Sequence, residues 1–301
     1  YNEQETIDIY LQEMKQVESN MSLEFEYLFV NDGSKDETLV RLKEAANKYT
    51  NVNYISFSRN FGKEAALLAG LEAVTGDLIT VMDVDLQDPP ELLPEMYEKI
   101  QEGYDIVGTR RSNRVGEPVL RSFFAKKFYQ VINRISDTEM VDGARDFRLM
   151  TRQVVDAILE LNEVNRFSKG IFSWVGFDTY YISYENRERS AGETTWNFWS
   201  LFKYSLEGII NFSEAPLTFA TLVGLGSCII SILAMIYFFL DNLVKQNPVP
   251  GWPSLVCIIL FLGGLQLFCL GIVGKYIGKI FTEVKKRPNY IIKESHCKSE
   301  D

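Results

Sequence analysis

Two long apolar runs without any charged residue constrain this chain more than its other features do. They cover residues 215–240 and 252–274 of a chain of 301 residues. Each run exceeds the ~20 apolar residues that a helix needs to cross a bilayer. A buried core helix is the alternative, but a core helix rarely stays uncharged over such a length. We therefore expect two membrane-spanning helices at these positions, joined by a short link.

Basic residues follow the second apolar run, whereas the link at 241–251 is nearly neutral. They are Lys275, Lys279, Lys285, Lys286 and Arg287. Because positive charge stays on the cytoplasmic side, both ends of the hairpin should face the cytoplasm. The chain then divides into a cytoplasmic domain at 1–195, a juxtamembrane amphipathic helix at 196–214, a transmembrane hairpin at 215–274 and a basic cytoplasmic tail at 275–301. This organisation predicts a multi-pass protein of the inner (cytoplasmic) membrane.

The composition disfavours several classes of function. A net charge of −10 argues against nucleic acid as a partner. The one histidine, His296, lies in the tail, which disfavours a Ser-His-Asp triad. None of the four cysteines pairs with another at metal-ligand spacing. Carboxylates, basic residues and a metal ion remain as the candidates for chemistry.

Strand-like and helix-like segments alternate through the soluble part. Strands are expected at 23–32, 51–59, 77–83 and 104–110, and helices at 36–49, 63–74 and 91–101. This order predicts an α/β fold with a mostly parallel sheet and helices on both faces. Such layouts normally start with a strand ahead of the loop at Tyr1, so we expect one there. Ligands bind beyond the carboxyl ends of the strands. The side chains expected along that rim are Asp32, Arg59, Asp83, Asp85 and Arg110.

A run of acids follows the third predicted strand, in DVDLQDPPE at 83–91. Side chains alternate along a strand, so Asp83 and Asp85 should point the same way and Gln87 should continue the row. Two carboxylates and an amide oxygen form an incomplete ligand set for Mg²⁺ or Mn²⁺, with open positions for substrate phosphate. Asp88, before two prolines, is interpreted as a helix cap. A purely structural role for the whole stretch is the alternative.

An earlier loop, VNDGSKDET at 30–38, also follows a predicted strand. Asp32 there could accept hydrogen bonds from a base or ribose, or the loop could be a simple turn and helix N-cap. The loop has neither the Gly-x-Gly-x-x-Gly of a dinucleotide fold nor the Gly-Lys-Ser/Thr of a P-loop. Nicotinamide chemistry and nucleoside triphosphate hydrolysis are therefore disfavoured.

A basic stretch stands out in this acidic chain. It contains Arg110, Arg111, Arg114, Arg121, Lys126, Lys127 and Arg134. Apolar residues recur at helical spacing within it, at Leu120, Phe124, Phe128 and Ile132. This pattern indicates an interfacial membrane helix, with a surface helix packed on the sheet as the alternative. A second interfacial candidate, at 196–212, carries two tryptophans suited to the headgroup layer.

Five motifs occur in order: YNE at 1–3, VNDGSKDET at 30–38, SRNFGKEAALLAGL at 58–71, DVDLQDPPE at 83–91 and DFRLM at 146–150. With the two apolar runs, they resemble the polyprenyl-phosphate glycosyltransferases, the inverting family that includes bactoprenol glucosyltransferase and dolichol-phosphate mannose synthase. The resemblance covers essentially the whole chain, including VKKRPNYIIKE at 284–294. It implies a nucleotide-sugar transferase fold of the GT-A type.

The resemblance also implies roles for individual residues. The residues expected to bind the donor nucleotide are Glu3, Asp32, Lys63 and Asp83. Those expected to hold the metal are Asp83, Asp85 and Gln87. Asp146 and Asp85 are the catalytic candidates. Arg189 is expected to bind phosphate, as are Arg110 and Arg121 from the basic stretch. The family's usual Arg-x-x-Gly-x-Ser-Lys reads RSAGETT at 189–195, so one phosphate contact lacks its lysine.

The implied reaction is inverting transfer of a hexose from UDP-glucose or UDP-N-acetylglucosamine to undecaprenyl phosphate, for cell-envelope glycosylation. The acceptor phosphate is already anionic, so cations rather than a base must bring two anions together. Asp146 would then orient the sugar or an arginine. Two alternatives stay open: a processive polysaccharide synthase, whose usual Gln-x-x-Arg-Trp is missing here, and an inactive membrane sensor of nucleotide sugars. Self-association through the hairpin or tail is a further expectation.

Overall fold

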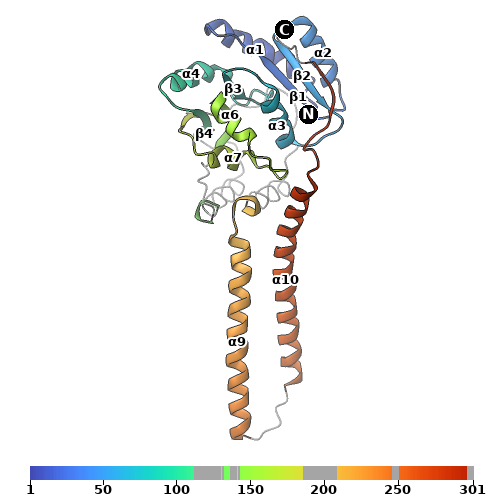
Figure 1. The fold of residues 1–301 in the computed structure, drawn as a ribbon, viewed down its shortest axis with the longest axis vertical. Helices are drawn as coiled ribbons and strands as arrows, with labels where there is room; N and C mark the ends of the chain where they lie inside the picture. Colours follow the sequence, from blue (N-terminus) through green and yellow to red (C-terminus); the bar gives the residue numbers. More distant parts are fainter. Residues whose placement is uncertain are drawn as a thin grey trace.

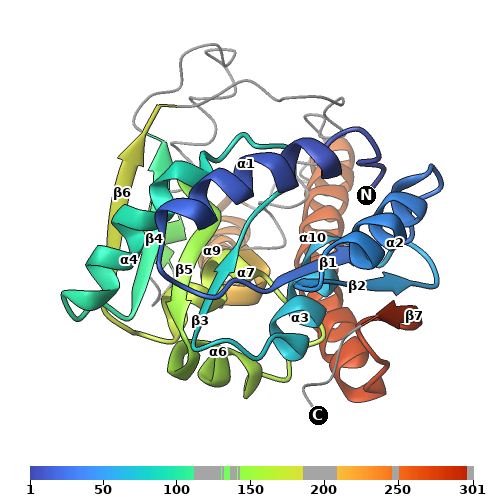
Figure 2. The ribbon, with the colours of Figure 1, turned by 90° about the horizontal axis from the view of Figure 1, so that it is seen from above.

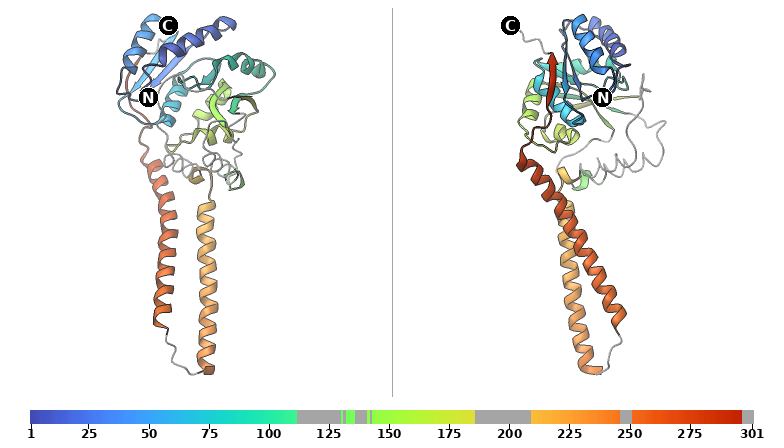
Figure 3. Two further views of the ribbon diagram at one scale, coloured as in Figure 1. Left: turned by 180° about the vertical axis from the view of Figure 1, so that it is seen from behind. Right: turned by 90° about the vertical axis from the view of Figure 1, so that its right-hand side faces the viewer.

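The computed structural model describes residues 1–111, 130, 132–135, 141, 143–185, 209–245 and 251–296. An α/β domain lies at one end of two long helices that run side by side (Figures 1 and 3). These helices are α9 (Ala215–Lys245) and α10 (Trp252–Lys285). Both ends of the described chain lie in the α/β domain, so the two helices form a hairpin that leaves the domain and returns to it.

The first sheet combines the two ends of the chain. Strands β1 (Tyr27–Asn31) and β2 (Val52–Phe57) pair in parallel. Strand β7 (Ile292–His296) pairs antiparallel with the other edge of β2 (Figure 2). The helices around this sheet are α1 (Ile7–Asn20), α2 (Thr38–Lys48) and α3 (Lys63–Ala73). The tail after α10 thus completes a sheet that starts about 260 residues earlier in the chain.

The second sheet has the order β3-β5-β4-β6. Its strands are β3 (Leu78–Val81), β4 (Ile106–Arg111), β5 (Ala144–Thr151) and β6 (Thr179–Tyr184). The helical elements beside it are η1 (Pro90–Leu92), α4 (Leu93–Gln101), α6 (Arg152–Leu159) and α7 (Ser168–Trp174). Strand β4 pairs in parallel with β6, whereas β5 runs antiparallel to both β3 and β4.

The predicted α/β class is present, and each strand and helix predicted by the alternation between residues 23 and 110 is found. One detail of the prediction is wrong: the sheets are mixed rather than mostly parallel. Strand β5 lies between β3 and β4 and opposes both of them. It could not be placed from the βα alternation, because the alternation predicted elements only as far as residue 110.

Apolar side chains from both sheets and their helices form the core. Met14 of α1, Leu42 of α2, Met96 of α4 and Phe147 of β5 are almost completely buried in one cluster. A second cluster joins β5 to α6 and α7. Burying a side chain of this size contributes about 1.5–3 kcal/mol. The strand that carries Asp146 is therefore held by packing on two sides.

The two long helices expose apolar side chains. Ile230 is 69% exposed, Phe261 70% and Leu267 71%. Such a continuous apolar surface is unfavourable in water and suits a lipid environment. By length and composition, the stretches Ala215–Ala234 and Phe261–Lys285 could each cross a membrane. The helices extend beyond the predicted spans, so the predicted tail at 275–301 begins as helix and continues into β7.

The membrane-helix candidates are attached to the α/β domain by specific contacts. The Glu283 carboxylate on α10 accepts hydrogen bonds from the amides of Val164 at 3.0 Å and Asn165 at 2.9 Å. The Tyr276 hydroxyl donates to the Ser213 carbonyl at 2.7 Å. Beyond α10, the ring of Tyr290 stacks on Phe57 with 4.9 Å between centroids. These contacts fix where the helices leave the domain.

Gly33→Ala tests the turn after β1. Gly33 has φ +64°, and an added Cβ would lie 2.3 Å from the carbonyl carbon of Arg59. The left-handed conformation and the clash together should lower the free energy of unfolding by about 2 kcal/mol or more. Thermal unfolding of the purified protein in detergent measures the loss. Gly103→Ala is the control, because Gly103 also has positive φ but open space around the added Cβ. Equal losses in both variants would contradict the clash.

Candidate active site

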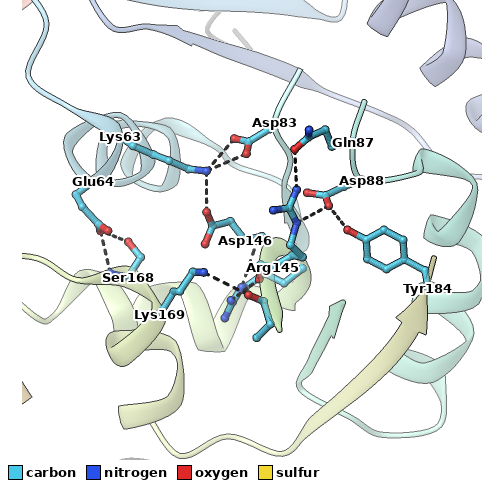
Figure 4. Close-up of polar contacts among 12 residues, drawn as sticks. Lys63, Glu64, Asp83, Gln87, Asp88, Arg145, Asp146, Ser168, Lys169 and Tyr184 are labelled. Carbon is cyan, nitrogen blue, oxygen red and sulfur yellow. Dashed lines mark hydrogen bonds and ion pairs between the residues drawn. The ribbon is translucent and has the colours of Figure 1, made fainter. Parts of the chain in front are cut away.

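Lys63 joins two acids from different parts of the α/β domain. Its ammonium lies 2.9 Å from an Asp83 carboxylate oxygen and 2.7 Å from an Asp146 oxygen. Figure 4 shows the three side chains converging from three separate elements. Lys63 is the first residue of α3, Asp83 follows β3, and Asp146 lies near the start of β5. A predicted donor residue, a predicted metal ligand and the predicted catalytic acid are therefore in direct contact.

The loop before Lys63 is positioned by Asp32. The two Asp32 carboxylate oxygens accept hydrogen bonds from the amide of Phe61 at 2.6 Å and that of Gly62 at 2.9 Å. Burial raises the pKa of Asp32 above its usual value, although these amide bonds oppose the shift. Asp32 thus connects the end of β1 to the start of α3. Asp32 therefore has a structural role, whereas the sequence predicted only that it binds the nucleoside.

The shared ammonium controls the charge of Asp146. Burial would raise the pKa of this carboxyl, but the cations of Lys63 and then Lys169 outweigh burial and hold the pKa below its ordinary value. Burial would likewise lower the pKa of Lys63, but Asp146 and Asp83 raise it overall. Asp146 is therefore ionised and Lys63 protonated at neutral pH. An acid in this state can accept hydrogen bonds but has no proton to donate.

The predicted metal motif is a turn rather than an extension of β3. Strand β3 ends at Val81, and Leu86 has φ +56°. The prediction that Asp83 and Asp85 point the same way along a strand is therefore wrong. The Asp83 side chain is 44% exposed. Asp85 is buried, and its carboxylate accepts a hydrogen bond from the Gln87 amide at 3.2 Å.

Asp88 is the centre of a buried network and not a helix cap. Arg145 donates to Asp88 at 2.9 Å and to the Gln87 side-chain oxygen at 3.2 Å. The hydroxyl of Tyr184 also donates to Asp88 (Figure 4). Burial and then the charge of Asp88 raise the pKa of Tyr184 to about 12, so its hydroxyl keeps its proton. No sequence pattern marked Arg145 or Tyr184 as a site residue. Arg145 directly precedes Asp146, but it is far from Asp88 in the sequence, so no local pattern predicts their contact.

Helix α7 brings a second lysine towards Asp146. Glu64, next to Lys63, accepts hydrogen bonds from the amide of Ser168 at 2.9 Å and from its hydroxyl. Lys169, next to Ser168, donates to the carbonyl of Ala144 at 3.3 Å. The starts of α3 and α7 are thus tied together, with Asp146 between their lysines (Figure 4). No sequence motif marked Lys169.

The oxygen chemistry of the turn suits a hard cation. Within the described ranges, no three His, Cys, Asp or Glu side chains are grouped so that they could hold a metal ion. The predicted set instead combines two carboxylates with the Gln87 amide, ligands that Mg²⁺ and Mn²⁺ accept. Asp83 and Asp146 already share the ammonium of Lys63, so the carboxylates at this turn attract a cation. The residues fit a divalent ion in their donor chemistry.

The other predicted site residues lie elsewhere. The Glu3 amide donates to the Thr38 hydroxyl at 2.9 Å, which places the N-terminal segment against the start of α2. Arg110, at the end of β4, donates to the Ser183 hydroxyl at 2.8 Å on β6. Arg121 and Arg189 are outside the described residues, as are most of the basic stretch and the segment at 196–208.

Residues 1–159 match Glycosyl transferase family 2. This range includes all of the acid and lysine cluster except Ser168, Lys169 and Tyr184. The chain belongs to this family. The match, with the mixed α/β domain and the two apolar helices, confirms the fold class expected from the sequence and the resemblance stated for its motifs. The family assignment identifies the cluster as part of a glycosyltransferase domain.

Relatives extend the similarity to the apolar helices. The putative glycosyltransferase CsbB of Bacillus subtilis (strain 168) is 44% identical, over 100% of this chain and 91% of its own length. The bactoprenol glucosyl transferase of Shigella phage SfII is 45% identical, over 98% of this chain and 96% of its own length. The mannosyltransferase PcManGT from Pyrobaculum calidifontis, solved in complex with GDP-Man and Mn²⁺, is 12% identical with a TM-score of 0.46 over 92% of this chain and 84% of that one.

Lys63→Met tests the shared ion pair. At pH 7 two carboxylates lose their common cation, so the free energy of unfolding should fall by about 1–3 kcal/mol. The folded pKa of Asp146 is depressed, so its stabilisation is fully present above the unfolded pKa of ~3.9 and is lost as the pH falls below that value. The deficit of the variant should persist from pH 7 to about 5 and shrink towards pH 3.

Chemical unfolding in detergent at several pH values measures this deficit. Lys43→Met is the matched control, because Lys43 is as exposed as Lys63 but pairs with a single carboxylate, that of Glu294, at 2.6 Å. Its loss should be smaller than that of Lys63→Met. A deficit in Lys63→Met that does not change with pH would argue against the role of Asp146.

Proposed function

We propose that the protein transfers a hexose, with inversion, from UDP-glucose or UDP-N-acetylglucosamine to undecaprenyl phosphate. The observation that carries this proposal is the 45% identity to a bactoprenol glucosyl transferase over 98% of this chain, apolar helices included. The cluster of Lys63, Asp83 and Asp146 supports it, since a reaction between two anions needs fixed cations and acids side by side. The product would be a polyprenyl-phosphate sugar for cell-envelope glycosylation.

The proposed displacement needs little proton chemistry. An oxygen of the acceptor phosphate supplies the electron pair for a new bond to the anomeric carbon, while the bond from that carbon to the nucleotide diphosphate breaks on the opposite face. The attacking oxygen is already anionic, so no base is required. Asp146, ionised because of its lysines, is suited to accept hydrogen bonds from the sugar or to orient the cations around it.

The chain's remaining candidates divide between donor and acceptor. Glu3 and Asp32 would hold the nucleoside, while Arg110, Arg121 and Arg189 would hold phosphates. Asp83, Asp85 and Gln87 would hold Mg²⁺ or Mn²⁺, which supplies charge neutralisation for the departing diphosphate when bound. Arg145 supports this arrangement, because it holds the Gln87 side chain and is itself held by Asp88.

We also propose that α9 and α10 cross the inner membrane and that the α/β domain and both chain ends are cytoplasmic. Lys275, Lys279 and Lys285 lie on the part of α10 nearest the domain, which is the distribution expected for a cytoplasmic end. Nucleotide sugars are water-soluble, so the donor reaches this domain directly. The acceptor arrives through the bilayer beside it.

A panel of radiolabelled nucleotide sugars tests the reaction. Membranes that contain the protein, supplied with undecaprenyl phosphate and Mn²⁺, should form one labelled lipid from UDP-glucose or UDP-N-acetylglucosamine. The labelled lipid should carry a single sugar. Chromatography and mass spectrometry of the lipid fraction identify the product. A labelled polymer would favour a processive synthase, and release of no nucleotide diphosphate from any donor would favour an inactive sensor.

Asp85→Asn tests the metal assignment. The variant keeps the shape of the side chain but loses a charge, so transfer should fall by about 100-fold or more. Binding of Mn²⁺, followed by electron paramagnetic resonance, should weaken in parallel. Asp77→Asn is the control, since Asp77 is exposed and precedes β3. Full Mn²⁺ binding by Asp85→Asn would refute the assignment of this carboxylate.

A further inference from the structure

Two helices present their first-turn lysines to the same acid. At the start of α3, Glu64 binds Ser168, and the preceding Lys63 forms the ion pair with Asp146 at 2.7 Å. At the start of α7, Ser168 is the partner of Glu64. The next residue, Lys169, lies close enough to Asp146 for its charge to lower the pKa of that carboxyl. Figure 4 shows Asp146 between the two ammonium groups.

The two lysines differ in their partners. Lys63 has two carboxylates, Asp83 and Asp146, within ion-pair distance. Within the described ranges, the Lys169 ammonium donates one hydrogen bond, to the neutral carbonyl of Ala144 at 3.3 Å. Lys169 is partly exposed, so a solute can reach it. Its charge is therefore not compensated by a direct partner in this part of the chain.

Three cations, Lys63, Lys169 and Arg148, act on Asp146. Arg148 is buried beneath the site, with its guanidinium 3.7 Å from the centre of the Phe172 ring, and its charge also acts on Asp146. Lys63 is paired with two carboxylates, whereas Arg148 and Lys169 donate hydrogen bonds to backbone carbonyls. The nearby Glu64 carboxylate is bonded to Ser168. An anion placed beside Lys169 would give its ammonium a charged partner.

Helix α7 is also where the site meets the helix hairpin. An added Cβ on Gly170 would lie 2.4 Å from the ring of Phe212, so α7 is in close contact with that side chain. The rings of Phe167 and Phe212 are 5.9 Å apart. Phe212 precedes the start of α9 by three residues. Figure 1 shows α7 at the base of the α/β domain, towards α9.

We propose that Lys169 binds the phosphate group of the lipid acceptor. This inference rests on the proposed function and assigns the acceptor side of the same site. A polyprenyl phosphate that lies in the bilayer beside α9 would bring its anionic headgroup towards the base of the domain. The Lys169 ammonium would then exchange the Ala144 carbonyl for a phosphate oxygen and form a charge-assisted hydrogen bond.

The arrangement also suits inversion. Lys63 and Asp83 lie on one side of Asp146, towards the turn proposed to hold the donor diphosphate, and Lys169 approaches Asp146 from α7 (Figure 4). An acceptor phosphate on Lys169 and a donor diphosphate near Asp83 would thus be separated by Asp146 and the sugar. Attack and departure could then occur on opposite faces of the anomeric carbon.

Lys169→Gln tests the assignment through separate Michaelis constants. With a short-chain polyprenyl monophosphate in detergent, KM for this acceptor should rise about tenfold or more, as expected for the loss of a charge-assisted hydrogen bond. KM for the nucleotide sugar should stay within about twofold of wild type. Lys169→Arg should restore most of the acceptor affinity. Lys48→Gln, which changes an exposed lysine on α2, should leave both constants unchanged.

Thermal unfolding of each variant shows whether the fold is kept. Equilibrium binding of the same polyprenyl monophosphate without donor should weaken in Lys169→Gln and not in Lys48→Gln. An unchanged acceptor KM, or an equal rise in both Michaelis constants, overturns the assignment. If wild type transfers sugar while Lys169→Gln behaves like wild type, only this inference fails. If wild type neither binds the polyprenyl phosphate nor glycosylates it, the proposed function fails as well.

Discussion

The ammonium of Lys63, held between Asp83 and Asp146, is the interaction on which the arrangement of the site depends. Two carboxylates at such short distances from one point would repel each other without a cation. The contact also joins the two halves of the domain, because α3 packs beside the first sheet while the acids belong to the second. Asp32 reinforces the joint by holding the loop that leads into Lys63. The charge balance of the site and the relative placement of the two sheets therefore have a common cause.

A second network, around Asp88, supports the same turn from beneath. Asp88 is buried and accepts hydrogen bonds from Arg145 and Tyr184, so its charge is compensated without solvent. Arg145 also holds Gln87, and its neighbour Asp146 points to Lys63. Successive residues of one strand thus serve two clusters, because side chains alternate between its faces. A change at either residue would disturb both the turn and the acid.

Much of the fold follows from local patterns, whereas the site depends on contacts between distant segments. The βα alternation located β1 to β4 because each strand is apolar and bounded by turn residues. Leu86 has a positive φ, which leucine rarely adopts, so the sequence does not predict it. Because the chain turns there, the prediction that Asp83 and Asp85 lie along a strand is wrong. The partners of Lys63, Arg145 and Lys169 are 20 or more residues away, so no local spacing predicts them. Family motifs marked Asp146 and Lys63, but neither the ion pair between them nor the second cation, Lys169.

The pairing of β7 with β2 has a consequence for how the protein is made. Residues 292–296 leave the ribosome after both apolar helices, yet they cover the edge of a strand that was synthesised near the beginning. Until then, the outer edge of β2 is an unpaired strand of the kind that attracts other chains. The first sheet is thus completed last, once the hairpin exists. A nascent chain that stops before residue 292 keeps this edge of β2 open, so the edge stays available for pairing with another chain.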